Sequence, residues 1–266
     1  MRQRFHHLAK LALAVTVTWS MQSPAAGQAK YTAPRTPDGK PDLQGIWEVR
    51  NTAAYNVSAH GPDTEMRAGA GVIVDPPDGK IPYQPWAAAK QQENYRNREM
   101  LDQVNKCFLP GVPRLMYLHF PFQIFQVPDA VIITSEYVHN VRNIFMQGNH
   151  LDQIYEWNGD SRGHWEGDTL VVDVANFNDE SWFDKSGNFH SDALHMVERY
   201  TRTEPDVLTY EVTIEDPKVF TRPWKMSMPI YQHREKNFRL LEYECHAYTE
   251  GPNATGDDKH NPAHTK

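Results

Sequence analysis

Apolar and polar residues alternate over the second half of the chain, most regularly between residues 207 and 214. There Leu208, Tyr210, Val212 and Ile214 are separated by single polar residues. A period of two predicts a β-strand with one buried face. A composition rich in β-branched and aromatic residues predicts further strands at 45–49, 122–127, 130–139, 141–147, 164–166, 169–174, 196–203, 224–232 and 238–246.

Most of these predicted strands are joined by short turns. The residues at 128–129, 167–168 and 204–206 are typical of hairpin turns. Consecutive antiparallel strands that each bury one face favour a sheet closed on itself, because closure removes the exposed edges. We therefore expect a mainly β protein built as an antiparallel up-and-down barrel, with a β-sandwich as the alternative.

One segment before most of the strands has helical character. Between residues 85 and 106, Pro85 suits the first helical turn, and it is followed by alanine, glutamine, glutamate and arginine, which are good helix formers. Residues 51–84 are rich in glycine, proline and aspartate and are expected to form a long loop. Residues 30–249 are thus predicted to form one barrel domain, and the polar residues 250–266 a disordered tail.

The first residues have the three parts of a secretory signal peptide. Arg2 and Arg4 form a basic start, residues 11–19 are an apolar run, and small residues follow Pro24. The run has about half of the ~20 residues that cross a bilayer. We expect cleavage near Ala29, which removes residues 1–29 and leaves a periplasmic or secreted chain without a membrane span.

Cleavage would make the chain more acidic. The formal net charge is −7, and loss of Arg2, Arg4 and Lys10 takes it to −10. Nucleic acids and anionic membranes require a basic face, so neither is expected as a partner. The two cysteines, Cys107 and Cys245, are expected to form a disulfide in an oxidising compartment. Two buried thiols and a thiol nucleophile are the alternatives.

Several stretches resemble a large group of exported, functionally uncharacterised bacterial proteins from acidobacteria and proteobacteria. The resemblance rests mainly on Ser-Arg-Gly-His-Trp-Glu-Gly-Asp-Thr-Leu-Val-Val-Asp at 161–173, His-Ser-Asp-Ala-Leu-His at 190–195 and Arg-Pro-Trp at 222–224. It covers nearly the whole mature chain but implies no activity. In addition, Gly45 and Trp47 in a first strand resemble the opening of lipocalin-type barrels, which implies a lipocalin-like fold with the tryptophan at the barrel floor.

Candidate chemistry rests on clusters of ionisable residues. His190 and Asp192 lie two residues apart and would point the same way on an extended segment. An aspartate beside a histidine can orient the imidazole for acid–base catalysis. With a third imidazole, such as His233 or His246, the pair could form a metal triad instead. The remaining interpretation is that His190 and Asp192 cap a loop and are solvated at the surface.

A second cluster alternates along one predicted strand. His164 and Glu166 would share a face, with Arg162 and Asp168 beside them. A neighbouring carboxylate stabilises the charged form of an imidazole. The turn at 167–168 explains the acidic residues equally well, because turns favour aspartate for backbone reasons. The candidate catalytic residues of the two clusters are His164, Glu166, His190 and Asp192.

Arginines and aromatic residues are the candidates for binding a substrate. Arg199 and Arg222 present a planar donor fork that suits a carboxylate or oxyanion, although a structural Arg–Glu pair accounts for them as well. Trp224 and His246 are expected to line a cavity for a flat or apolar small molecule. Core packing for the tryptophan and an outward position for the histidine are the alternatives.

The main functional hypothesis is an exported enzyme that acts on a small molecule by acid–base chemistry in a barrel cavity, as a lyase, isomerase or hydrolase. No organic cofactor is expected. The first alternative is a non-catalytic binding protein for an apolar or aromatic small molecule. The second is a metal-dependent enzyme that uses a His/Asp cluster, so a metal ion is the one cofactor left open.

Overall fold

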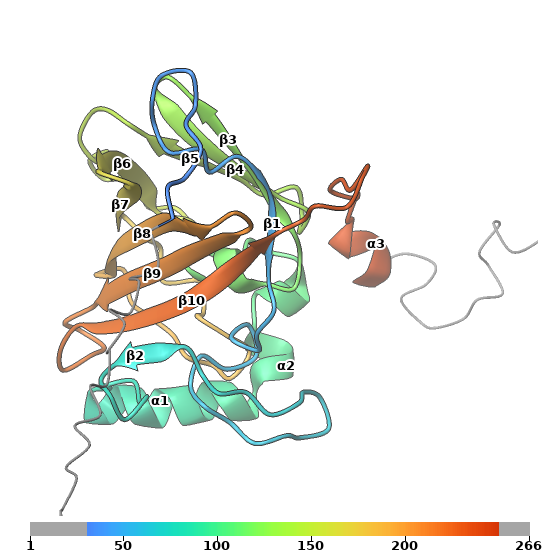
Figure 1. Cartoon of the computed structure of the whole chain (residues 1–266). Coiled ribbons are helices and arrows are strands. Elements are labelled where there is room, and N and C mark those ends of the chain that lie inside the picture. Colours follow the sequence, from blue (N-terminus) through green and yellow to red (C-terminus); the bar gives the residue numbers. More distant parts are fainter. Residues whose placement is uncertain (1–30, 250–266) are drawn as a thin grey trace, which may run out of the picture. The chain divides into compact units, whose positions relative to one another are not determined.

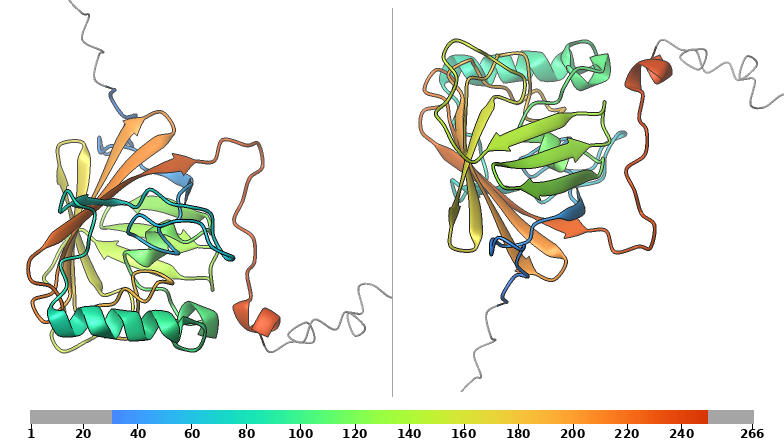
Figure 2. Two further views of the ribbon diagram at one scale, coloured as in Figure 1. Left: turned by 90° about the horizontal axis from the view of Figure 1, so that it is seen from below. Right: turned by 90° about the horizontal axis from the view of Figure 1, so that it is seen from above.

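The polypeptide forms a closed β-barrel. The computed structural model describes residues 31–249, so the predicted signal peptide and tail lie outside the described residues. Nine strands follow one another around the barrel in chain order, and β10 pairs back with β1 (Figures 1 and 2). They are β1 (Gly45–Val49), β3 (Phe122–Val127), β4 (Ala130–Ser135), β5 (Val141–Phe145), β6 (Asp160–Glu166), β7 (Thr169–Ala175), β8 (His195–Glu204), β9 (Val207–Glu215) and β10 (Trp224–Gln232). The predicted lipocalin-like barrel is confirmed, and the β-sandwich is not.

Two features depart from a simple up-and-down barrel. The short strand β2 (Ile73–Asp75) pairs with β10 outside the ring. Strands β5 and β6 run parallel, because the chain between them crosses back before β6 begins. Only two residue pairs join them, Ile144 with Ser161 and Phe145 with Arg162. Beyond Arg162, β6 is therefore paired with β7 alone among the described strands.

Large side chains occupy the barrel interior. The alternation that predicted β9 is confirmed, since Leu208, Tyr210, Val212 and Ile214 are at most 1 % exposed. Trp47 is also buried, and its indole NH donates to the carbonyl of Leu43. A short 3-10 helix, η2 (Arg114–Tyr117), packs against β1 and adds three buried side chains to the core: Leu115, Met116 and Tyr117. The interior is thus mainly a packed core.

One ion pair lies within this core. Arg142 of β5 donates to both carboxylate oxygens of Glu198 of β8, and both side chains are at most 1 % exposed. The hydroxyls of Tyr200 and Tyr210 donate to the same carboxylate at 3.0 and 2.7 Å, and Ser161 accepts from the guanidinium. Burial of this charge pair is tolerated because nearly every polar atom has a partner.

The predicted helix over 85–106 begins at Pro85 but is divided into three parts. They are α1 (Pro85–Arg96), α2 (Arg98–Leu101) and the 3-10 helix η1 (Val104–Lys106). Asp102 leaves the helical conformation, and its carboxylate receives two hydrogen bonds from Arg114 at 2.7 and 2.8 Å. This buried pair accounts for the end of α2, since an unbroken helix would direct Asp102 elsewhere.

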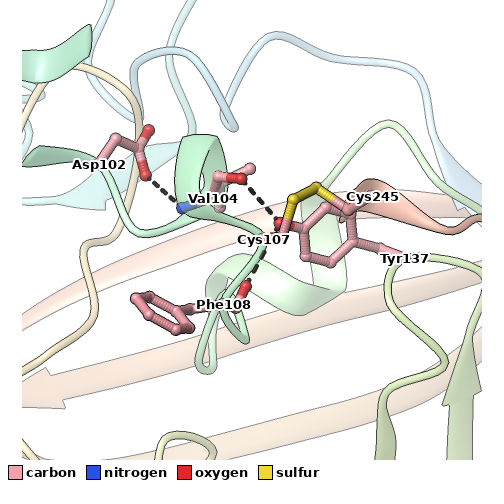
Figure 3. The surroundings of a disulfide bond; sticks show 6 residues. All are labelled: Asp102, Val104, Cys107, Phe108, Tyr137 and Cys245. Carbon is pink, nitrogen blue, oxygen red and sulfur yellow. Dashed lines mark hydrogen bonds between the residues drawn. A yellow bond between two sulfur atoms is a disulfide. The ribbon is translucent and has the colours of Figure 1, made fainter. Parts of the chain in front are cut away.

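The expected disulfide joins Cys107, after η1, to Cys245 at the start of α3 (Cys245–Thr249). Figure 3 shows Tyr137 next to the bridge, with its hydroxyl donating to the carbonyls of Val104 and Phe108. The predicted strand at 238–246 does not form, because β10 already closes on β1 and leaves no edge there. Among residues 31–249, no helix combines the length and apolar character needed to cross a bilayer.

Candidate functional site

The outer face of β6–β8 carries a row of ionisable side chains, which we call the outer polar face. Alternation along β6 turns its even-numbered residues outward, and Asp173 of β7 is paired in register with Arg162. Residues from β8 and from the connection before β6 complete the face. Its members are His150, Asp160, Arg162, His164, Glu166, Asp173, His195 and Arg199.

Asp173 joins two imidazoles on this face. Its Oδ1 lies 2.6 Å from Nε2 of His150, and its Oδ2 lies 2.9 Å from Nε2 of His195. Burial acts to raise the pKa of Asp173, but the hydrogen bonds from both histidines outweigh it and lower that pKa. The carboxylate therefore stays ionised between two imidazole rings.

His150 is held from its other side as well. Its Nδ1 lies 3.0 Å from Oδ2 of Asp160, which also accepts from the Leu151 amide and from the Arg162 guanidinium. Burial acts to raise the pKa of Asp160, and the three sets of hydrogen bonds outweigh it and lower that pKa. Both ring nitrogens of His150 thus face carboxylate oxygens, which can only accept, so this geometry suits His150 as a proton donor.

The predicted cluster on β6 also forms on this face. Nε2 of His164 lies 3.2 Å from Oε1 of Glu166, whose Oε2 accepts from Arg199 at 2.9 Å. The hydrogen bond from Arg199, and secondarily that from His164, lowers the pKa of Glu166. His164 and Glu166 have half or more of their side chains exposed, so solvent screens this cluster strongly.

A pocket of about 500 Å³ opens at the end of β6, and we call it the rim pocket. Among the four histidines considered as candidates, only His164 lines it. Its walls come from the segment before β1, from the β3–β4 hairpin and from β6, and they contain Thr36, Pro37, Asp38, Lys40, Gln44, Gln126, Val127, Pro128, Val131, Met146, His164 and Trp165. The pocket therefore combines exposed loop residues with Val131 of the core at one end of the barrel, whereas a cavity enclosed by the barrel was expected.

The other predicted catalytic pair is not brought together. His190 is 3 % exposed, and its ring nitrogens lie 2.9 Å from Oγ of Ser181 and 2.9 Å from the carbonyl of Ser191. Burial lowers the pKa of His190. Asp192 is exposed and bonded to Lys218. The turn at 191–194 replaces the extended conformation that the prediction required.

The remaining predicted binding residues are spread over the molecule. Arg222 pairs with Asp75 of β2, Trp224 is fully buried in the core, and His246 is exposed on α3. His233, considered as a third metal ligand, lies between the carboxylates of Glu48 and Glu235. No group of three metal-ligating side chains with suitable geometry occurs within residues 31–249.

Sequence patterns alone missed the centre of the outer polar face. Asp173 interrupts the apolar run of β7, which is the one local signal for it. His150 lies in the connection before β6 and carries no such signal. Residues 159–163 also match the pattern Gly-x-Ser-x-Gly, but Ser161 lies inside β6, is 2 % exposed and bonds Arg142, so it is not a strand-to-helix nucleophile.

Comparison with models of protein families and with curated proteins finds no match for this chain. Any functional assignment therefore rests on the geometry of the site.

Proposed function

We propose that this protein is an exported enzyme that transfers protons on a small organic molecule without an organic cofactor. The observation that carries the proposal is the contact of one carboxylate, Asp173, with both His150 and His195. The reaction classes that suit it are isomerisation, elimination and hydrolysis. The site is the outer polar face of the barrel and not its interior.

Two imidazoles beside one carboxylate meet the basic requirement of acid–base catalysis. One group must remove a proton while another supplies one, and the two need different environments. His150 lies between two carboxylates, whereas His195 is bonded through Nε2 to the single carboxylate of Asp173. We therefore assign His150 as the acid, which exchanges its Nδ1 contact with Asp160 for the substrate when it donates. His195 is the base, acting through Nδ1, and Asp173 orients both rings through their Nε2 atoms.

Access and charge at the site support this assignment. The side chains of His150 and His195 are 28 % and 41 % exposed, so a small molecule reaches both rings without unfolding of the barrel. Arg162 lies in register with Asp173 and supplies a fixed positive charge beside an anion that develops during proton removal.

Export is part of the same proposal. The pattern of residues 1–29 supports it, and the disulfide between Cys107 and Cys245 suits an oxidising compartment.

Hydrogen–deuterium exchange at carbon tests the proposal without knowledge of the substrate. The purified chain is incubated in deuterium oxide with a library of small carbonyl compounds, hydroxy acids and esters, and each compound is followed by mass spectrometry. We expect at least one compound to gain deuterium or to change in structure. His150→Gln and His195→Gln should abolish this change.

The matched control for these variants is His139→Gln. His139 is also a surface imidazole bonded to a carboxylate, that of Glu244, and it lies outside the outer polar face. The His139→Gln variant should leave the reaction unchanged. If no compound reacts, or if the reaction persists in both His150→Gln and His195→Gln, the proposal is wrong.

A further inference from the structure

The rim pocket is a second site, and its floor is apolar. Strand β5 ends at Phe145, so the end of β6 has no neighbour on that side, and Val131, Met146 and Trp165 meet in the gap. Gly163 is needed there, because a Cβ atom on it would lie 2.9 Å from the Met146 sulfur. Trp165 also packs against the hydrophobic core, which fixes the floor.

The segment before β1 forms the opposite wall and is bound to the barrel along its length. The Gln126 side chain accepts from the Leu43 amide at 2.7 Å and donates to the Pro41 carbonyl at 3.0 Å. Near its other end, Arg35 pairs with Asp168 in the β6–β7 turn at 2.5 Å. The pocket is therefore bounded by segments held in place, as ligand pockets usually are.

The polar residues of the rim pocket give it one unpaired cation. Lys40 is exposed and has no ion-pair partner within residues 31–249, the described part of the chain. The carboxylate of Asp38 accepts from the hydroxyl of Thr36 at 2.5 Å, which fixes its position but leaves its negative charge, so an anion on the ligand has to lie on the Lys40 side of the pocket. The charge of Glu166, next to the pocket, is offset by Arg199. An ammonium group without a partner at the mouth of an apolar pocket favours an anionic group on the ligand.

We infer that the rim pocket binds a flat, mainly apolar molecule that carries one anionic group. The apolar part lies against Val131, Met146 and Trp165, and the anion lies near Lys40. This inference does not rest on the acid–base chemistry of His150 and His195, which are not among the residues that line the pocket.

Two fluorescent probes of the same skeleton test the inference with the full mature chain. Anilinonaphthalene sulfonate carries an anion, and phenyl-naphthylamine lacks it. We expect both probes to bind at one saturable site and to quench Trp165, with the sulfonate probe binding more tightly. Lys40→Met should weaken the sulfonate probe roughly two- to fivefold, the range of an exposed ion pair, and leave the neutral probe unchanged.

Two further variants address the floor and the wall. Met146→Trp should reduce the affinity for both probes at least tenfold by filling the pocket. Since Met146 packs against the core, Val127→Glu is the second variant: Val127 is 48 % exposed, and a carboxylate there should repel the sulfonate probe. Lys225→Met and Val141→Glu, at exposed positions outside the lining, are the matched controls.

Three results would overturn the inference. The first is the absence of saturable binding of either probe to the wild-type chain. The second is wild-type affinity for the sulfonate probe in both single variants, Val127→Glu and Lys40→Met. The third is an equal loss of affinity for both probes in Lys40→Met. It would mean that the ligand has no anionic group that Lys40 recognises.

Discussion

Nε2 of His150 lies 2.6 Å from Oδ1 of Asp173, although the first residue belongs to a connection and the second to the outward face of β7. The contact depends on the parallel pairing of β5 with β6, because that pairing brings the chain between them back over the outer wall of the barrel. A regular antiparallel hairpin at this point would leave no connection to carry His150. The irregular junction thus forms both the imidazole–carboxylate centre and the opening of the rim pocket.

His190 should be a neutral ring with its proton on Nδ1. The carbonyl of Ser191 can only accept, so Nδ1 donates to it and Nε2 accepts from the hydroxyl of Ser181. Burial lowers the pKa of His190, so the neutral ring stabilises the fold at a pH above 6.5, the ordinary pKa of histidine. This stabilisation is lost as the pH falls below that value. Nitrogen-15 spectra of the ring at pH 7 should show this tautomer. A proton on Nε2 instead would contradict the assignment.

Removal of Arg142 alone should be more damaging than its removal together with the charge of Glu198. Arg142→Met leaves a buried carboxylate without its counter-charge, which costs about 3–5 kcal/mol. Glu198→Gln in the same chain removes that charge while still accepting from Tyr200 and Tyr210. Urea unfolding at pH 7 should therefore show the double variant to be more stable than Arg142→Met. Strictly additive losses would mean that the two residues do not act as a pair.

Asp184 should make the protein less stable as the pH rises from about 4 to 6. Burial raises its pKa from 3.8 to about 6, in spite of hydrogen bonds from Asn188 and Val57. A carboxyl with a raised pKa contributes its stability below its unfolded value and loses it as the pH rises through the folded value. A shift of this size corresponds to about 3 kcal/mol.

The variant Asp184→Asn checks this prediction, because it keeps an acceptor for Val57 and does not ionise. Its free energy of unfolding should change less between pH 4 and pH 6 than that of the wild type. Parallel curves for the two chains over this interval would show that Asp184 is not the group responsible.

Reduction of the disulfide should lower the thermal midpoint by several degrees. The bridge closes a loop with a sequence separation of 138 residues, for which the chain-entropy model gives an upper value of about 5 kcal/mol. Within the native state, the stability lost on reduction should be lost mainly by residues 233–249, because Cys245 connects this segment to Cys107 after η1. Limited proteolysis under reducing conditions should therefore cut this segment first. The double variant of Cys107→Ser and Cys245→Ser should not respond to the reductant, and equal midpoints for reduced and oxidised wild type would contradict the prediction.

The local sequence pattern correctly predicted the parts of the fold that depend on neighbouring residues in the chain. The alternation in β9 predicted which of its side chains are buried, because a strand with one core-facing side has no other way to place them. The residues 238–246 have an equally strand-like composition, but β10 already pairs with β1, and the segment forms only an isolated bridge, Tyr243 with Tyr137. The division of the helix depends on Asp102 and Arg114, whose pairing is a tertiary contact.

In the candidate site, too, local spacing predicts contacts within one segment but not contacts between segments. His164 and Glu166 share a strand face, so their spacing predicted their contact. His190 and Asp192 have the same spacing, but a turn directs one inward and the other to Lys218. The contact of Asp173 with His150 and His195 joins two strands and a connection, and no spacing within one segment encodes it.

Deuterium incorporation by the Asp173→Asn variant tests whether Asp173 orients the two imidazoles for proton transfer. The substitution keeps the shape of the side chain but removes the carboxylate that orients both imidazoles, whereas His164→Gln alters the neighbouring cluster on the same face and leaves Asp173 intact. For a compound that the wild type labels in deuterium oxide, we predict at least a hundredfold lower rate with Asp173→Asn, about the contribution of a positioned acid or base, and an unchanged rate with His164→Gln. Labelling by Asp173→Asn at the wild-type rate, or its loss in His164→Gln alone, would contradict the assignment of His150, Asp173 and His195 as the acid–base centre.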